Sequence, residues 1–143
     1  MTGPRGRPRW RDDEGSILPL LLGYALLVVA VLFVCACATD LYIAQKRLDA
    51  LADAAALAGA DGFVLVADGD GARAALTEAG VRAQATALLE ALPGDALLVE
   101  ATTADGVTAR VTVGGEWHPP LVSMFVPDGV PLRATATSRT ALR

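Results

Sequence analysis

Residues 17–38 read ILPLLLGYALLVVAVLFVCACA, and this stretch decides the architecture of the chain. It contains no charged side chain and is almost wholly apolar. A helix needs about 20 consecutive apolar residues to cross the hydrocarbon core of a bilayer, and this stretch meets that length. Pro19 falls in the first turn, where its missing N–H is not needed. The sequence therefore predicts one membrane-spanning helix, residues 17–39, which Asp40 closes.

The charges around this helix predict its orientation. The tail, residues 1–16, is rich in arginine, and the nearest basic residues after the helix are Lys46 and Arg47. Basic residues concentrate on the cytoplasmic side of a membrane helix. We therefore expect a single-pass protein of the cytoplasmic membrane, with the N-terminus inside and the C-terminal domain outside.

The helix should continue beyond the membrane over residues 40–61. No Gly or Pro interrupts residues 24–58, and Gly59 with Asp61-Gly62 predicts its end. Apolar residues recur at alternating intervals of three and four, which places them on one helical face. This predicted seam consists of Leu41, Ala44, Leu48, Leu51, Ala55 and Ala58. It can pack on the chain's own downstream domain or on a neighbouring subunit, and the sequence leaves both interpretations open.

Residues 40–61, DLYIAQKRLDALADAAALAGAD, resemble the N-terminal region of TadE/TadG-like proteins of the tight-adherence (Flp) pilus system. The resemblance lies in Arg47-Leu48, Ala52-Asp53 and the run AAALAGA at residues 54–60. It implies a short-form pilus-assembly or minor-pilin-like protein. The partners it implies are membrane lipid and pilin-like or Tad-apparatus proteins. The alternative is a membrane-tethered or lipid-anchored envelope binding module unrelated to pili.

Three kinds of N-terminal processing have matching residues. Gly15 and Ser16 lie where the resembling family carries its entry glycine, and prepilin peptidase would cut between them. However, Leu20 stands where type IV pilins usually carry Glu. Residues 36–38, Ala-Cys-Ala, fit a signal-peptidase site, although the apolar run is longer than usual for a signal peptide. Residues 34–37 distantly resemble a lipobox, with lipidation at Cys37. A retained helix is the preferred interpretation.

Residues 62–143 predict a small α+β domain that is broadly pilin-like. Residues 63–66 are a short apolar stretch, and a turn follows at residues 68–71. Residues 72–92 predict a second helix that Pro93-Gly94 ends. Its expected apolar stripe consists of Leu76, Ala79, Ala83, Ala87 and Glu90, and Val81, Leu88 and Leu92 broaden the apolar surface.

The remaining segments predict a small antiparallel sheet. Residues 96–103, 107–113 and 131–140 alternate in the manner of strands, and Asp105-Gly106 is a hairpin turn signal. Residues 117–126 form a loop or short helix in this interpretation. Its apolar side chains would dock on the sheet, namely Leu121, Val122, Phe125 and Val126. Because aromatic residues are only 5% of the chain, the core must be built from Ala, Val and Leu.

The sequence contains no constellation that indicates catalysis. His118 is the only histidine, and no nucleophile, phosphate-binding or zinc motif accompanies it. Asp68 and Asp70 suggest an ordinary turn, because Arg73 and Ala79 break the register of a calcium loop. Cys35 and Cys37 lie two apart on a helix and cannot bind one metal together. We expect no enzyme activity, no cofactor, no metal, no small-molecule substrate and no nucleic-acid partner.

Overall fold

The computed structural model describes residues 17–69, 71–120, 123 and 127–140 of the chain. The chain divides into two compact units, Met1–Ala36 and Cys37–Arg143. Gly15 and Ser16, the predicted processing residues, lie outside the described residues, as do Leu121, Val122, Phe125 and Val126.

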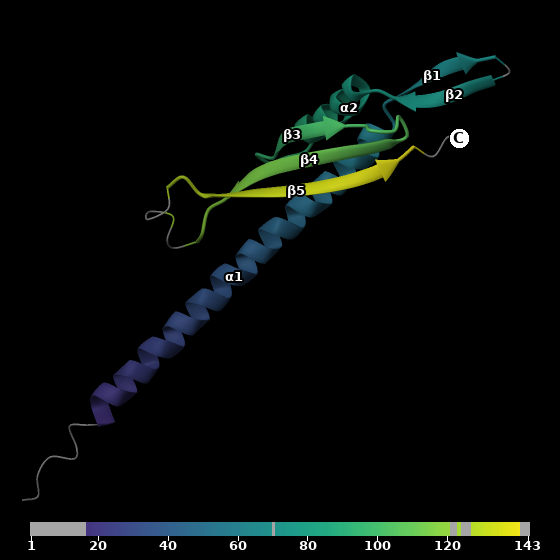
Figure 1. Cartoon of the computed structure of the whole chain (residues 1–143). Coiled ribbons are helices and arrows are strands. Elements are labelled where there is room, and N and C mark those ends of the chain that lie inside the picture. The colour runs from purple at the N-terminus through teal and green to yellow at the C-terminus, as the bar shows by residue number, and fades with distance from the viewer. Residues whose placement is uncertain (1–16, 70, 121–122, 124–126, 141–143) are drawn as a thin grey trace, which may run out of the picture. The chain divides into compact units, whose positions relative to one another are not determined.

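One helix, α1 (Ile17–Ala60), contains the whole apolar stretch (Figure 1). Within the first unit its described side chains are exposed, apart from a half-buried Phe33. Among the described residues, α1 is the one helix long and apolar enough to cross a membrane. Such a helix is compatible with a single-pass anchor, because every backbone polar group can be satisfied within the helix itself.

Residues 37–60 of α1 belong to the second unit, where one face of the helix becomes buried. The buried residues are spaced three and four apart with two adjacent pairs, and they are Leu48, Ala52, Ala55, Ala56, Gly59 and Ala60. The helix ends one residue after Gly59. Its last turn tightens there, because the N–H groups of Asp61 and Gly62 donate to the carbonyls of Ala58 and Gly59, each over 3.1 Å.

A two-stranded antiparallel hairpin follows, formed by β1 (Phe63–Asp68) and β2 (Gly71–Leu76). The predicted start of the second helix at Ala72 is therefore wrong, because residues 72–76 pair with residues 63–67. Two residues connect the strands, and Gly69 has φ +51, a value that favours glycine in a tight hairpin turn. Cross-strand pairing here outweighs the helix preference of alanine.

The second helix, α2 (Glu78–Ala91), begins at an N-cap. The Thr77 side chain accepts a hydrogen bond from the Gly80 N–H over 3.1 Å. The stripe predicted for this helix is wrong, because Ala79, Ala83, Ala87 and Glu90 are exposed. The buried face centres on Val81, which the prediction included, and on Ala85, which it did not; both have 0% exposure. The stripe was based on Leu76, which lies in β2 and therefore fixes no face of the helix.

Three strands form an antiparallel sheet in the order β3–β4–β5 (Figure 1). They are β3 (Leu97–Thr102), β4 (Thr108–Trp117) and β5 (Val130–Arg139), close to the predicted ranges. Gly106 takes φ +67 in the turn between β3 and β4. The Asp105 carboxylate accepts from the N–H groups of Val107 and Thr108, over 3.0 and 2.6 Å. These bonds lower the pKa of Asp105 to about 2, because they favour the charged carboxylate.

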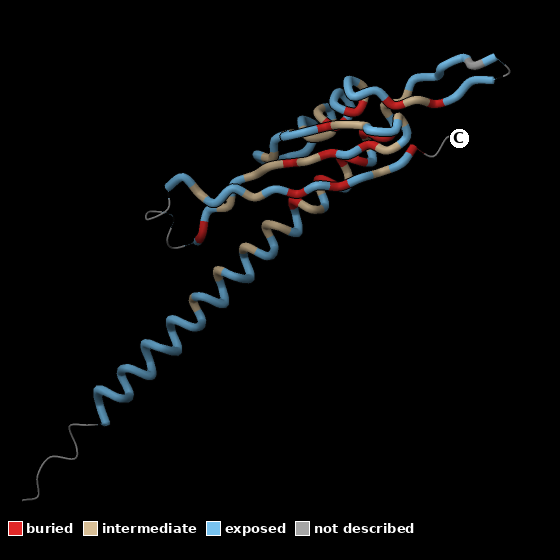
Figure 2. The backbone as a smooth tube through the Cα atoms, in the orientation of Figure 1, coloured by how far each residue is buried: buried red, intermediate tan, exposed pale blue. Residues whose placement is uncertain are grey.

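The core lies on one face of this sheet. Ala109, Val111 and Val113 alternate along β4 with 0% exposure, as the period-two pattern predicts. Red segments in Figure 2 mark the core on the strands and on the domain end of α1. The largest fully buried side chains are Val81, Val111 and Val113, so the core is built from small residues. The predicted α+β class is confirmed, whereas the pilin-like part of that prediction stays a prediction.

Candidate partner-binding surface

The predicted seam of α1 lies on or beside the face that turns toward the sheet. Leu48 and Ala55 are buried, and the other four seam residues are half-buried: Leu41, Ala44, Leu51 and Ala58. A Cβ placed on Gly115 of β4 would lie 3.5 Å from Leu48 Cδ1, which puts Leu48 against that strand. Much of the seam therefore packs within the chain, and its role toward a partner stays a prediction.

Gly59 lies where α1 approaches α2 and β4 closely. A Cβ at this position would lie 2.9 Å from Val81 Cγ1 on α2 and 3.6 Å from Ala109 Cβ on β4. The first distance is shorter than van der Waals contact, so glycine is required for α1 and α2 to pack this closely. The small residues of the AAALAGA run thus have a packing explanation within the chain.

Two side-chain hydrogen bonds tie the first turns of this helical segment to the end of the sheet. Trp117 Nε1 donates to Asp40 Oδ2 over 2.7 Å, across 77 positions of sequence. Gln45 Nε2 donates to the backbone carbonyl of Arg133 over 3.0 Å and to Asp49 Oδ1 over 3.0 Å. Sequence reasoning missed both ties, because nothing in the spacing of Asp40 and Gln45 indicates which distant strand they meet.

A cluster of charges lies beside these ties. Lys46 Nζ forms a salt bridge with Asp49 Oδ2 at 3.1 Å and lies 5.8 Å from the centre of the Tyr42 ring. The hydrogen bond to Asp49 raises the pKa of Lys46. The pKa of Asp49 is lowered, first by its hydrogen bond from Gln45 and then by the one from Lys46. Because both side chains are exposed, the pair contributes little to stability.

A groove of about 350 Å³ opens between α1 and the near end of the sheet. Small residues from three elements share its walls, among them Ala44, Gly94, Ala96 and Gly115, with Leu48 and Leu51 beside them. Arg47, Asp95 and Glu116 lie at the same groove. The groove therefore exposes part of the predicted seam at Ala44, Leu48 and Leu51.

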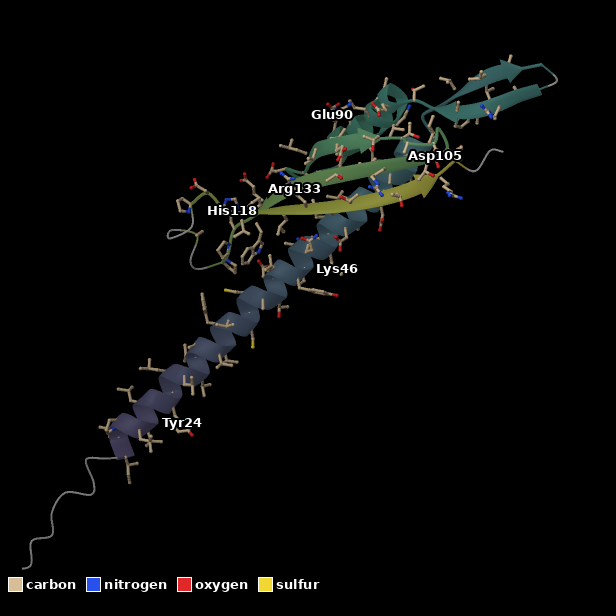
Figure 3. All side chains as sticks on the ribbon, viewed as in Figure 1. Tyr24, Lys46, Glu90, Asp105, His118 and Arg133 are labelled. Carbon is tan, nitrogen blue, oxygen red and sulfur yellow. The ribbon has the colours of Figure 1, made fainter. Side chains whose placement is uncertain are left out.

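A second hollow, of about 430 Å³, lies at the same end of the sheet. Leu97 and Val99 of β3 line it and are 71% and 45% exposed, and His118 and Arg133 lie at its edge. Figure 3 shows His118 and Arg133 near one another at this end of the domain. Asp95, Glu116 and His118 share this hollow, and its lining includes no second histidine and no cysteine.

The hairpin β1–β2 is a third exposed apolar feature. Val64, Leu65 and Val66 are 48%, 67% and 46% exposed. The hairpin therefore adds to the exposed apolar surface of the described residues. In the described part of the chain, no group of three or more His, Cys, Asp or Glu side chains could hold a metal ion.

One segment of the chain, residues 15–62, is recognisable by comparison with known proteins. A family model described as "Putative Flp pilus-assembly TadE/G-like" matches residues 15–62. This segment is TadE/G-like. The match covers the whole of α1 and ends at Gly62, so the resemblance inferred from the AAALAGA run is confirmed over this segment.

The match also bears on the role of the protein. It supports a role related to Flp pilus assembly, with apparatus proteins as the suggested partners. No curated protein and no solved structure matches the chain. The TadE/G-like segment contains both the apolar stretch and the part of α1 that packs under the sheet.

Proposed function

We propose that this protein is a membrane-anchored, non-catalytic structural component of a Tad/Flp-type pilus apparatus, similar to a minor pilin. The observation that carries the proposal is the family match over residues 15–62. That segment includes the apolar anchor and, at its far end, the helical face that the domain buries. An anchor continuous with a packed helix suits a protein that holds a domain at a membrane surface.

In this proposal the N-terminus lies in the cytoplasm and residues 62–143 lie outside the cytoplasmic membrane. Arginine enrichment before α1 supports that orientation, since basic residues are retained on the cytoplasmic side. The Trp117–Asp40 and Gln45–Arg133 hydrogen bonds support a fixed arrangement of sheet and helix within the second unit. A domain held in this way offers pilin-like partners a preorganised surface, which lowers the entropic cost of binding.

Deletion of the gene, followed by imaging of surface fibres, tests the proposal. We expect fibres to be lost or strongly reduced and to return when the full chain is expressed from a plasmid. A control strain expresses Ala83→Gly, a change at an exposed position of α2, and should assemble fibres normally. Unchanged fibre number in the deletion strain, with no pilus protein crosslinked to the chain, would contradict the proposal.

The mass of the mature N-terminus distinguishes the modes of anchoring. A chain that begins at or near Met1 fits an uncleaved anchor, and one that begins at Ser16 fits prepilin-type processing. A diacylated Cys37 would instead support a lipid-anchored envelope module outside the pilus system. The measurement needs only intact-protein mass spectrometry of the membrane fraction.

A further inference from the structure

One end of the sheet is held beside the point where α1 leaves the apolar stretch. Trp117, the last residue of β4, donates its indole N–H to the carboxylate of Asp40 over 2.7 Å. Asp40 follows Ala38, the last residue of the apolar stretch, by two positions. Because a helix rises about 1.5 Å per residue, Asp40 lies about 3 Å beyond that stretch along the helix axis. The hydrogen bond therefore holds Trp117 at the same height along α1.

Burial along α1 shows that the helix is covered down to this height. Cys37 and Leu41, one turn apart on the same face, are half-buried, whereas the three residues between them are exposed. Ala44 and Leu48 continue this covered line as half-buried and buried residues. Cys37 is itself part of the apolar stretch. The covered face of α1 thus begins within the last turn of the segment that is apolar enough to lie in lipid.

In a bilayer, this height corresponds to the headgroup layer. The hydrocarbon core is about 30 Å thick and the bilayer with its headgroups is about 40–45 Å thick, so each headgroup layer is about 5–7 Å deep. Residues 17–38 are sufficient to fill the hydrocarbon core. Asp40 and Tyr42, which follow directly, then lie in the headgroup layer. Trp117 lies there as well, because it is bonded to Asp40.

The side chains at this end of the domain have the chemistry of a membrane interface. Trp and Tyr are enriched there, because each combines a large apolar ring with a polar group. Tyr42 is 63% exposed, and Val130, which pairs with Trp117 at the end of the sheet, is 37% exposed. The bond from the Trp117 indole also partners the Asp40 carboxylate, which lowers the cost of holding this acidic group beside the hydrocarbon.

Charges of both signs occur at this end. The exposed acidic residues Glu116 and Asp128 lie in sequence beside Trp117 and Val130, and Lys46 Nζ lies 5.8 Å from the centre of the Tyr42 ring. A mixed set of exposed charges gives little net attraction to an anionic surface. Contact with lipid is therefore expected through the aromatic and apolar side chains, and a zwitterionic bilayer is sufficient.

We propose that the β4–β5 end of the domain docks in the headgroup layer of the membrane that α1 crosses, with Trp117 and Tyr42 at the contact. The partner of this surface is the phospholipid bilayer itself. The domain is then attached at two places, through α1 and through the docked end of the sheet, which restricts its tilting over the membrane. This inference rests on the membrane anchor of the proposed function and adds a second contact with the same membrane.

The experiment locates single tryptophans of the full chain in phosphatidylcholine vesicles. Trp10→Phe leaves Trp117 as the only tryptophan, since the chain has two. Two further proteins also carry Trp117→Phe and place the tryptophan elsewhere. One has Leu27→Trp, in the middle of the apolar stretch, and the other has Leu65→Trp, at an exposed position of β1. Quenching is measured with spin-labelled lipids, with the label on the headgroup or near the end of an acyl chain, and with iodide in the buffer.

We expect the headgroup label to quench Trp117 more strongly than the chain-end label does. The order should be reversed for Leu27→Trp, which reports on the anchor alone. Leu65→Trp should lose emission to iodide and to neither lipid label, because α1 continues for about 30 Å from Asp40 to Ala60 before β1 begins. Figure 1 shows the hairpin at the opposite end of the domain from the start of β5. High salt should leave the quenching of Trp117 unchanged, since the contact does not depend on net charge.

Four results would overturn the inference. Trp117 that neither lipid label quenches, beside a Leu27→Trp protein that the chain-end label quenches, would remove the docked end and leave the anchor standing. Stronger quenching of Trp117 by the chain-end label would place the indole in the hydrocarbon. Equal quenching of Trp117 and Leu65→Trp by the headgroup label would contradict docking through this end, and loss of the Trp117 quenching in high salt would contradict contact through the rings.

Failure of the proposed function gives different results. A Leu27→Trp protein that neither lipid label quenches would contradict the anchor itself, and the docked end with it. Normal fibres in the deletion strain, with the expected quenching of all three proteins, would contradict the pilus role and retain the contact of this domain with the membrane.

Discussion

Gly80 lies where α2 meets the segment that follows α1. Replacing it with alanine sets a gain in helix propensity against a steric overlap with the backbone of that segment. A Cβ at Gly80 would overlap the backbone carbonyl oxygen of Gly62. The approach is mutual, because a Cβ at Gly62 would lie 2.6 Å from the Gly80 carbonyl oxygen and 3.1 Å from Gln84 Cγ. The obstacle at Gly80 is main chain, so no side-chain rotation can relieve it. Either helix α2 or the end of the TadE/G-like segment must move.

The sign of the effect follows from two magnitudes. Alanine is favoured over glycine inside a helix by about 1 kcal/mol, so propensity alone predicts that Gly80→Ala stabilises the protein. Overpacking a tightly packed site costs about 1–3 kcal/mol, and a backbone overlap belongs at the upper end of that range. We therefore expect a net loss of about 2 kcal/mol in the free energy of unfolding.

The assay is urea unfolding of the full chain in detergent micelles, followed by the fluorescence of Trp117. Trp10→Phe in all variants makes Trp117 the only tryptophan, since the chain has two. Ala83→Gly, at an exposed position of the same helix, calibrates propensity and should cost about 1 kcal/mol. A Gly80→Ala protein as stable as its parent, or more stable, would show that the close approach of Gly62 and Gly80 is wrong.

Three further changes test other parts of the structure by the same unfolding assay or by its variation with pH. Leu48→Ala should lower the free energy of unfolding by about 2–3 kcal/mol because the side chain is buried, and Leu57→Ala, on the exposed face, should lower it by no more than about 0.5 kcal/mol. Trp117→Phe should lower the free energy of unfolding by about 1 kcal/mol because the hydrogen bond to Asp40 is lost, and Asp40→Asn in the Trp117→Phe protein should lower it little further. Unfolding of these variants is followed by far-ultraviolet circular dichroism in place of fluorescence. If the losses from the two substitutions add, the hydrogen bond is contradicted. Asp105 stabilises the fold above its ordinary pKa of 3.8, and this contribution is lost as the pH falls toward about 2, so Asp105→Asn should reduce the loss of stability between pH 4 and pH 2. A wild-type and an Asp105→Asn chain with the same pH dependence would contradict the bonds at that turn.

Strong periodicity made much of the fold predictable. The apolar run of α1 is long enough to cross a membrane, and its continuation without Gly or Pro predicted an end near Gly59, close to the observed end at Ala60. The alternation of Val107 to Val113 predicted which side chains of β4 are buried, apart from Val107 itself, which lies before the strand and is 41% exposed. In both elements the local pattern of apolar residues alone was enough to predict the structure.

The errors lie where alanine carries the pattern. The sequence of residues 72–76 predicts a helix because Ala and Arg favour helices, yet these residues pair with residues 63–67 of β1 across a two-residue turn. Because Leu76 belongs to β2, the stripe that was drawn from it did not follow the buried face of α2. Alanine is small enough to be buried or exposed at little cost, so it records the packed face only weakly. The long-range ties of Asp40 and Gln45 left no local pattern at all.

The two faces of α1 show the same weakness. The predicted seam is rich in alanine, which suits close contact with the sheet, and Gly59 continues that function at its end. The opposite face has larger apolar side chains, Ile43 and Leu57, that the domain does not cover. Isolated apolar side chains are common on protein surfaces, so the size of the residues alone does not show which face of α1 is packed. Close contact with the sheet favours small residues, and the contacts of the folded domain identify that face.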